Sequence, residues 1–335
     1  MGIDLPLIWV VIIAFGLMMY VIMDGFDLGI GILSPFVHDR EDRDLMVNTV
    51  APVWDGNETW LVLGGAALYG AFPLAYSLLL SALYLPLILM LAGLICRGVA
   101  FEFRFKADAA HRPFWDKMFA VSSYGATFFQ GVSLGAFIDG FHVSGPSYLG
   151  GAFDWLSPFS VFTGLGLIVA YALLGATWLT MKTAGDLQAR MIACARWVTL
   201  ALLAVIAIVS LWTPLSHPAI AARWFSLPNL YYFAPVPVLI LAVGALMLRL
   251  LRGTPNAGPF LLTLVLLFLG YSGLAISLWP NIIPPGVSFR AAASPPESMG
   301  FALVGTLFII PVILTYTAWA YHVFRGKVTS NEGYH

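Results

Sequence analysis

The feature that most constrains this chain is a series of long apolar runs separated by short polar or proline-containing connections. A helix needs about 20 apolar residues to cross the roughly 30 Å hydrocarbon core of a bilayer. Hydrophobic residues make up 60% of the 335 residues and charged residues 10%, which excludes an ordinary water-soluble domain. The runs predict about nine transmembrane helices, at residues 6–33, 57–78, 80–102, 117–139, 157–181, 193–213, 231–251, 259–280 and 299–325.

The connections between these runs are short. Phe72, Pro73 and Ser77 predict a tight uncharged turn between the second and third helices. Prolines 214, 218, 228 and 255 are expected in later connections, and residues 280–296 form the most loop-like segment. No connection is long enough to hold a soluble domain, so residues 1–335 are predicted to form a single transmembrane domain. The sequence therefore predicts an all-α integral membrane protein.

Lysines and arginines predict the orientation of the helices. If the N-terminus lies outside, the cytoplasmic side receives all but two of the sixteen lysines and arginines. Only Arg223 and Arg290 remain outside, which is the asymmetry that the positive-inside rule predicts. We therefore expect a periplasmic N-terminus and a cytoplasmic C-terminus.

Four carboxyl groups lie in or beside the first two predicted helices. Asp24 and Asp27 are three residues apart in the first, and Asp55 and Glu58 repeat this spacing at the start of the second. A charge at the centre of a membrane helix costs about 2.5–3.5 kcal/mol on insertion scales. With little lysine or arginine among them, four neighbouring carboxyls cannot all stay ionised, so we expect them to take up protons and pass them inward from the cytoplasm.

Other interpretations of these residues stay open. Asp55 and Glu58 also fit the N-cap and capping-box positions of a helix. Asp24 and Asp27 can pair instead with Arg97, Arg104 or another subunit. Trp60 fits an anchor at the membrane interface. Glycine pairs at 25 and 29 and at 131 and 135 predict only close helix packing.

Metal, haem and nucleic-acid sites are not expected in this chain. The six histidines lie in predicted loops, at helix ends or, for His335, at the terminus, so the helix-buried pairs that would ligate haem or copper are missing. Cys96 and Cys194 have no metal-site or disulfide spacing, and the methionines are expected to pack. The formal net charge of −1 and the lack of a basic stripe give no footprint for nucleic acid.

Several segments spread along nearly the whole chain carry recognisable motifs: DGFD at 24–27, NTVAPVWDGN at 48–57 followed by Trp60, RGVAFEFR at 97–104, MKTAGD at 181–186 and TYTAW at 315–319. Together these segments resemble subunit II of the cytochrome bd-type quinol oxidases. The short outer connections are similar to those of the cyanide-insensitive branch.

The resemblance implies an electrogenic quinol:oxygen oxidoreductase in the bacterial cytoplasmic (inner) membrane. Two haems b and one haem d are expected in the partner subunit I, so this chain needs no haem ligands or catalytic residues of its own. The implied fold is two four-helix bundles plus one peripheral helix. The implied partners are subunit I, a small single-helix subunit and lipids, with quinol and dioxygen as substrates of the complex. Some members also bind a structural quinone in this subunit, to which no residue can be assigned.

Site residues follow from the resemblance position by position. Asp24, Asp27 and Asp55 match acidic positions of the family, with Asp55 implied in proton delivery and Trp60 in a hydrophobic oxygen path. Glu58 falls where some members have an uncharged residue. Two alternatives remain: a proton-coupled secondary transporter, which would usually show broken helices and an internal repeat, and a purely structural subunit whose carboxyls serve only assembly.

Overall fold

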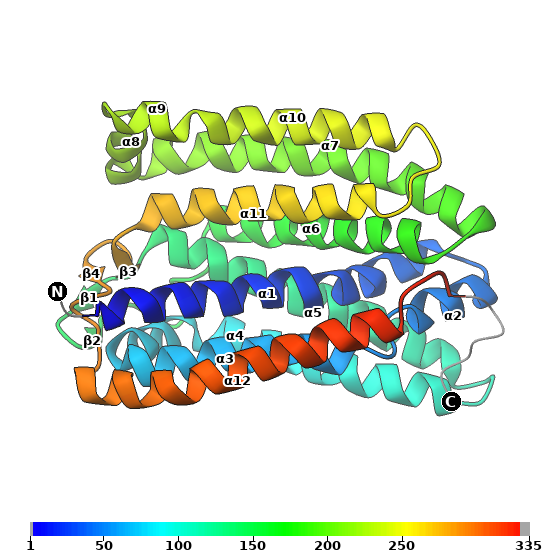
Figure 1. Ribbon diagram of the computed structural model, residues 1–335, viewed down its shortest axis with the longest axis horizontal. Coiled ribbons are helices and arrows are strands. Elements are labelled where there is room, and N and C mark those ends of the chain that lie inside the picture. Colours follow the sequence, from blue (N-terminus) through cyan, green and yellow to red (C-terminus); the bar gives the residue numbers. More distant parts are fainter. Residues whose placement is uncertain (1–2, 329–335) are drawn as a thin grey trace.

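The computed structural model describes residues 3–328, and its long helices run side by side along one axis (Figure 1). His335 lies outside the described residues. The long helices of the described part are α1 (Leu5–Leu33), α3 (Trp54–Ala71), α4 (Pro73–Lys106), α5 (Arg112–Asp139), α6 (Pro158–Lys182), α7 (Gly185–Ser216), α10 (Pro235–Leu250), α11 (Gly258–Leu278) and α12 (Pro296–Val323).

Seven helical segments of the described residues are long and apolar enough to cross a membrane. They include every long helix except α3 and α5. The first turns of α3 carry Asp55, Asn57 and Glu58, and α5 carries serines, threonine and glutamine along its length. The prediction of an all-α, multi-pass membrane protein is confirmed, while seven rather than nine helices satisfy a purely hydropathic criterion.

Short elements, most of which lie outside the predicted spans, close the two ends of the bundle. Helix α2 (Arg40–Asn48) follows the 3-10 helix η1 (Ser34–Phe36) at one end. Helices α8 (Pro218–Phe225) and α9 (Asn229–Phe233) lie at the other end, with the N-terminus (Figure 1). Two small antiparallel hairpins share that second end. They are β1 (Val143–Ser144) with β2 (Ser147–Tyr148), in which Val143 faces Tyr148, and β3 (Asn281–Ile283) with β4 (Val287–Ser288), in which Asn281 faces Ser288.

Prolines explain where most of the helices begin. Pro6, Pro73, Pro158 and Pro259 occupy the first or second position of a helix, where the missing N–H has no intrahelical acceptor and the fixed φ suits the helix. The second and third predicted helices therefore separate at Phe72, which confirms the expected turn at Phe72 and Pro73, while the limits of the two predicted spans, near residue 79, were too late.

Two other predicted boundaries were wrong. Pro214 lies inside α7, which continues to Ser216, because a proline in the last turn disturbs few hydrogen bonds. The predicted span 231–251 is divided by Ala234 into the short helix α9 and the longer α10.

The core is centred on α6, the most deeply buried of the candidate membrane helices, which packs against α1, α5, α7 and α11. Glycines bring its backbone close to those of α1, at Gly29, and of α5, at Gly131. A Cβ atom added at Gly29 would lie 2.0 Å from the carbonyl oxygen of Tyr171 and 2.8 Å from the nitrogen of Gly175. A Cβ atom at Gly131 would lie 2.8 Å from the Cα atom of Gly164. The predicted close packing at both glycine pairs is confirmed.

Arginines lie at the ends of the bundle, but two of them are buried inside a long helix. Arg290 binds Asp4 at the N-terminal end, with guanidinium-to-carboxylate distances of 2.6 and 3.1 Å, and Arg223 lies in α8 at the same end. Arg97 and Arg104, expected among the cytoplasmic cations, are each only 1% exposed inside α4. Both are buried because carboxylates of neighbouring helices surround them.

Candidate functional site

The predicted acidic cluster is present around an arginine of α4. Asp24, at 0% exposure, and Asp27, at 1%, lie in the second half of α1. The Arg97 guanidinium nitrogen Nη2 lies 2.9 Å from Asp24 Oδ1 and 2.7 Å from Glu58 Oε2. One buried cation therefore joins carboxylates from α1 and α3.

Asp27 belongs to a second branch of the same cluster. The amide Nδ2 of Asn57 donates to Asp27 Oδ2 at 2.8 Å, and it also approaches the carbonyl oxygen of Met23 at 3.4 Å. The hydroxyl of Tyr321, from α12, donates to Asn57 Oδ1 at 2.9 Å. This chain of bonds fixes the orientation of the amide. The other oxygen of Asp27, Oδ1, is buried with no hydrogen-bond partner among the described residues.

Arg97 corrects the expectation that little lysine or arginine lies among the carboxyls. The guanidinium contacts Asp24 and Glu58, whereas Asp27 binds Asn57 instead, so one cation compensates only part of the charge of the three carboxyl groups. The side chain of Glu58 is 30% exposed, whereas Asp24 is fully buried. The cluster thus extends from a partly exposed carboxyl to two that are enclosed by protein.

Asp55 does not join the other three carboxyls by any contact in the described structure. It is exposed and occupies the second residue of α3, where the positive end of the helix dipole favours an acidic side chain. Val53 is the N-cap, and no side-chain capping bond forms, so the capping-box interpretation of Asp55 and Glu58 was wrong. The two carboxyls still share one face of α3, because they are three residues apart.

Trp60 is buried at 1% exposure, so the interpretation as an interfacial anchor was wrong for this residue. Its ring meets that of Phe15 edge to face at 5.7 Å, and it packs in a small cluster with Tyr20 and Met23 of α1. Trp60 therefore lies one helical turn from Asn57 and beside the segment of α1 that carries Asp24.

The alternative in which Asp24 pairs with Arg97 is confirmed by their ion pair. The sequence did not indicate two other polar members of the site, Asn57 and Tyr321. Nothing in the sequence indicated Tyr321, because its position beside α3 depends on how α12 packs.

A second charged network lies nearer the α2 end. Arg104 binds Asp44 of α2 and Asp116 of α5, each at 2.5 Å. Arg112 also reaches Asp44, at 3.3 Å. These bonds hold α2 against α4 and α5. The alternative in which Arg104 pairs with Asp24 or Asp27 is therefore excluded.

Histidines and cysteines do not form a metal site within residues 3–328, where no group of three metal-ligating side chains occurs. His111 and His217 are at helix N-caps, His38 and His142 are in connections, and His322 is in the last turn of α12. Their predicted positions at loops and helix ends are confirmed.

Replacing Tyr321 with phenylalanine is expected to lower the stability of the assembled protein by about 1 kcal/mol, because it removes one partly buried hydrogen bond. The thermal midpoint of the purified protein in detergent measures this. Tyr316→Phe is the matched control, since Tyr316 lies on the same helix but is 63% exposed. Equal midpoints for the two variants would show that the bond to Asn57 contributes nothing.

Comparison with known proteins supports the family that the sequence resembles. The profile of "Cytochrome bd terminal oxidase subunit II" matches residues 5–324. Cytochrome bd-I ubiquinol oxidase subunit 2 of Escherichia coli K12 is 28% identical over 98% of this chain and 96% of its own length. Cytochrome bd ubiquinol oxidase subunit 2 of Bacillus subtilis is 27% identical over 97% of both chains.

The fold agrees with a solved structure of this class. A chain of the bd oxidase from Geobacillus thermodenitrificans superimposes with a TM-score of 0.80, covering 96% of this chain and 99% of that chain at 16% identity. The match of the family profile to almost the whole sequence decides the assignment. This chain belongs to the cytochrome bd terminal oxidase subunit II family and is subunit II of a bd-type quinol oxidase complex.

Proposed function

We propose that this subunit delivers protons from the cytoplasm toward the oxygen-reducing centre of the complex. The observation that carries the proposal is the gradient of exposure along the carboxyls. Asp55 is exposed, Glu58 is 30% exposed on the same face of α3, and Asp24 lies buried across Arg97 from Glu58. Asp55 would accept a proton at the surface, and Glu58 would pass it to the enclosed part of the cluster.

Arg97 stabilises this arrangement without carrying protons itself, because a guanidinium stays protonated in proteins. It holds Asp24 and Glu58 within 2.9 Å of one nitrogen, which keeps the two carboxylates close to each other. Since carboxyls outnumber the guanidinium, a proton arriving at the cluster reduces its excess negative charge. The cluster is therefore suited to take up and release a proton as a unit.

In the complete enzyme, two haems b and one haem d would be held by subunit I, and this subunit would support that haem-bearing partner. Quinol oxidised on the outer side would release protons there. Protons for the reduction of dioxygen to water would come from the cytoplasm. This separation would make the enzyme electrogenic without pumping a proton across the membrane.

The membrane arrangement that fits this function has all nine long helices crossing the bacterial cytoplasmic membrane as one domain. The N-terminus would be periplasmic and the α2 end cytoplasmic. Support comes from the alternating direction of successive helices and from Arg223 and Arg290, which share the N-terminal end (Figure 1). Helices α3 and α5 carry polar side chains but run alongside the apolar helices. The two four-helix bundles plus a peripheral helix are part of the same proposal, as are a small third subunit and a structural quinone.

Trp60 is proposed to line an oxygen path. Its support is the packing of its buried ring against the buried Tyr20 and Met23, together with the edge contact to Phe15, because dioxygen partitions into apolar rather than polar surroundings.

Replacing Asp55 with asparagine is expected to lower quinol-dependent oxygen uptake about tenfold or more while the haem spectrum persists, because general proton-transfer groups typically contribute 10²–10⁴-fold. Oxygen uptake by the purified complex measures this. Glu41→Gln is the matched control, since Glu41 is an exposed carboxyl of α2 at the same end.

Two outcomes would count against proton delivery. Full turnover of the Asp55→Asn complex would exclude Asp55 from the route. Loss of haem together with turnover would favour the purely structural alternative, in which the carboxyls serve assembly. A transporter is disfavoured because the chain matches an oxidase subunit family along residues 5–324.

A further inference from the structure

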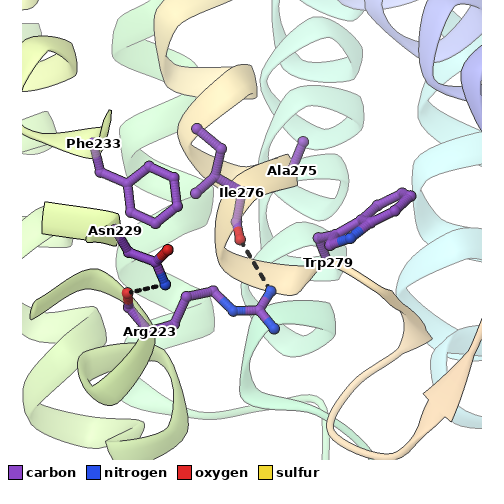
Figure 2. A pocket seen from close by; sticks show the side chains of 6 residues that line it. All are labelled: Arg223, Asn229, Phe233, Ala275, Ile276 and Trp279. Atoms are coloured by element: carbon purple, nitrogen blue, oxygen red, sulfur yellow. Dashed lines mark hydrogen bonds between the residues drawn. The ribbon is translucent and has the colours of Figure 1, made fainter. Parts of the chain in front are cut away.

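A cavity of about 500 Å³ lies at the N-terminal end of the bundle, between α8, α9 and the last turn of α11. It is well separated in the fold from α3, which carries Asp55 and Glu58 (Figure 1). Figure 2 shows the side chains around it, with Arg223 on one side, Trp279 on the other and Phe233 above. Its lining residues are Arg223, Asn229, Phe233, Ala275, Ile276 and Trp279.

Arg223 has no ion-pair partner within the described residues. Its guanidinium makes one hydrogen bond, of 3.3 Å, from Nη1 to the carbonyl oxygen of Ile276 (Figure 2). A guanidinium has five N–H donors, so most of them remain available to an acceptor in the cavity. Arg290, at the same end of the molecule, differs because both of its terminal nitrogens bind the carboxylate of Asp4.

The main chain that carries Arg223 is held in place. Asn229 donates from Nδ2 to the carbonyl oxygen of Arg223 at 3.1 Å, and the indole of Trp224 donates to Ser277 at 3.1 Å. These two contacts connect α8 to α9 and to α11. The guanidinium is thus presented to the cavity from a fixed backbone rather than from a free surface loop.

Aromatic side chains mark this end as a membrane interface. Tyr231 and Tyr232 are each 72% exposed, Phe225 is 62% exposed, and Trp279 is 46% exposed at the edge of the cavity. Tryptophan and tyrosine concentrate at the headgroup level of bilayers, where one part of the ring is apolar and another is wet. The cavity is therefore placed where lipid headgroups lie.

We propose that this cavity binds the headgroup of an anionic phospholipid, with the phosphate on the guanidinium of Arg223 and the glycerol and upper acyl carbons against Phe233, Ala275 and Trp279. Arginine suits phosphate because its planar fork can form two parallel charge-assisted hydrogen bonds. An anionic ligand also compensates a cation that has no carboxylate beside it. A neutral lipid or a quinone head would leave that charge unbalanced.

The bond from Arg223 to Ile276 shows that the arginine also satisfies a carbonyl in the last turn of α11. A purely structural role for Arg223 would need only this 3.3 Å bond. It would give no reason for a cavity of this size beside the guanidinium or for the exposed aromatic residues around it. The proposal concerns lipid binding at the outer end and stands apart from proton delivery through α3.

The test is mass spectrometry of phospholipids that co-purify with the intact complex in mild detergent. The wild-type complex is expected to retain a phosphatidylglycerol-type lipid. Arg223→Gln is expected to bind added phosphatidylglycerol about tenfold or more weakly, because a charge-assisted bond is lost. Arg290→Gln, which removes a charge from the same end, is expected to bind as the wild type does.

A second variant separates loss of the lipid site from loosening of α8, which would also follow from loss of Arg223. Ala275→Trp fills the cavity and leaves the guanidinium in place, and it is also expected to lose the lipid. Retention of the lipid by Arg223→Gln or by Ala275→Trp would overturn the proposal. Displacement of the lipid by millimolar inorganic phosphate would show a free-phosphate site, and equal binding of phosphatidylcholine or recovery of quinone alone would exclude an anionic lipid.

Discussion

Replacing Arg97 with methionine is expected to destabilise the assembled complex by about 3–5 kcal/mol, because removing one partner of a buried ion pair leaves the other charges uncompensated. Arg97 is 1% exposed and lies within 2.9 Å of Asp24 and 2.7 Å of Glu58. The cation–π contact of Arg97 with the Trp54 ring, at 5.5 Å from the guanidinium carbon to the ring centroid, would also be lost. The thermal midpoint and the yield of haem-containing complex measure the effect.

Arg249→Met is the matched control for this variant. Arg249 lies near the end of α10, is exposed, and forms no ion pair within the described residues. The double variant Arg97→Met with Asp24→Asn is expected to recover part of the stability, because it removes a buried carboxylate along with its cation. If Arg97→Met alone had the stability of the wild type, the carboxyls would not depend on this cation.

Replacing Gly29 with alanine is expected to cost about 3 kcal/mol or more, at or beyond the upper end of ordinary overpacking in a core. The new methyl group would lie 2.0 Å from the carbonyl oxygen of Tyr171, and backbone atoms cannot rotate away as a side chain can. Helices α1 and α6 would have to separate, which would disturb the segment of α1 that holds Asp24 and Asp27. Complex yield and thermal midpoint are the measurements.

Gly65→Ala provides the control for a glycine in a helix interior. A Cβ atom at Gly65 of α3 meets nothing within 4 Å, so the substitution is expected to be neutral or slightly stabilising through better helix propensity. Similar losses from Gly29→Ala and Gly65→Ala would mean that close approach of α1 and α6 is not what Gly29 provides.

The helices were predictable because apolar runs report directly on the cost of crossing a bilayer. The same reasoning found Asp24 and Asp27, since a carboxyl in an apolar run needs a physical explanation. The break at Phe72 was less well placed, because no charge separates α3 from α4. The small elements α2, α8 and the two hairpins were missed, because each is too short for a hydrophobic period to show.

The contacts within the site depended on packing that a single sequence does not reveal. Local spacing suggested that Asp55 and Glu58 act as a pair, but only Glu58 reaches Arg97. Asn57 looked like part of a helix start and proved to be the link between Asp27 and Tyr321. Trp60 looked interfacial because it lies near the start of the second predicted helix, yet residues of α1 cover its ring.

The most direct test of proton delivery through this subunit is the rate of proton uptake after an oxygen pulse, measured with a pH-sensitive dye on the α2 side of the complex reconstituted in vesicles. We expect Asp55→Asn and Glu58→Gln each to slow uptake on that side about tenfold or more, with an unchanged haem spectrum, and we expect Glu41→Gln to match the wild type. Unchanged uptake in both variants, with intact haem, would contradict proton delivery through this subunit and place the proton route outside this chain.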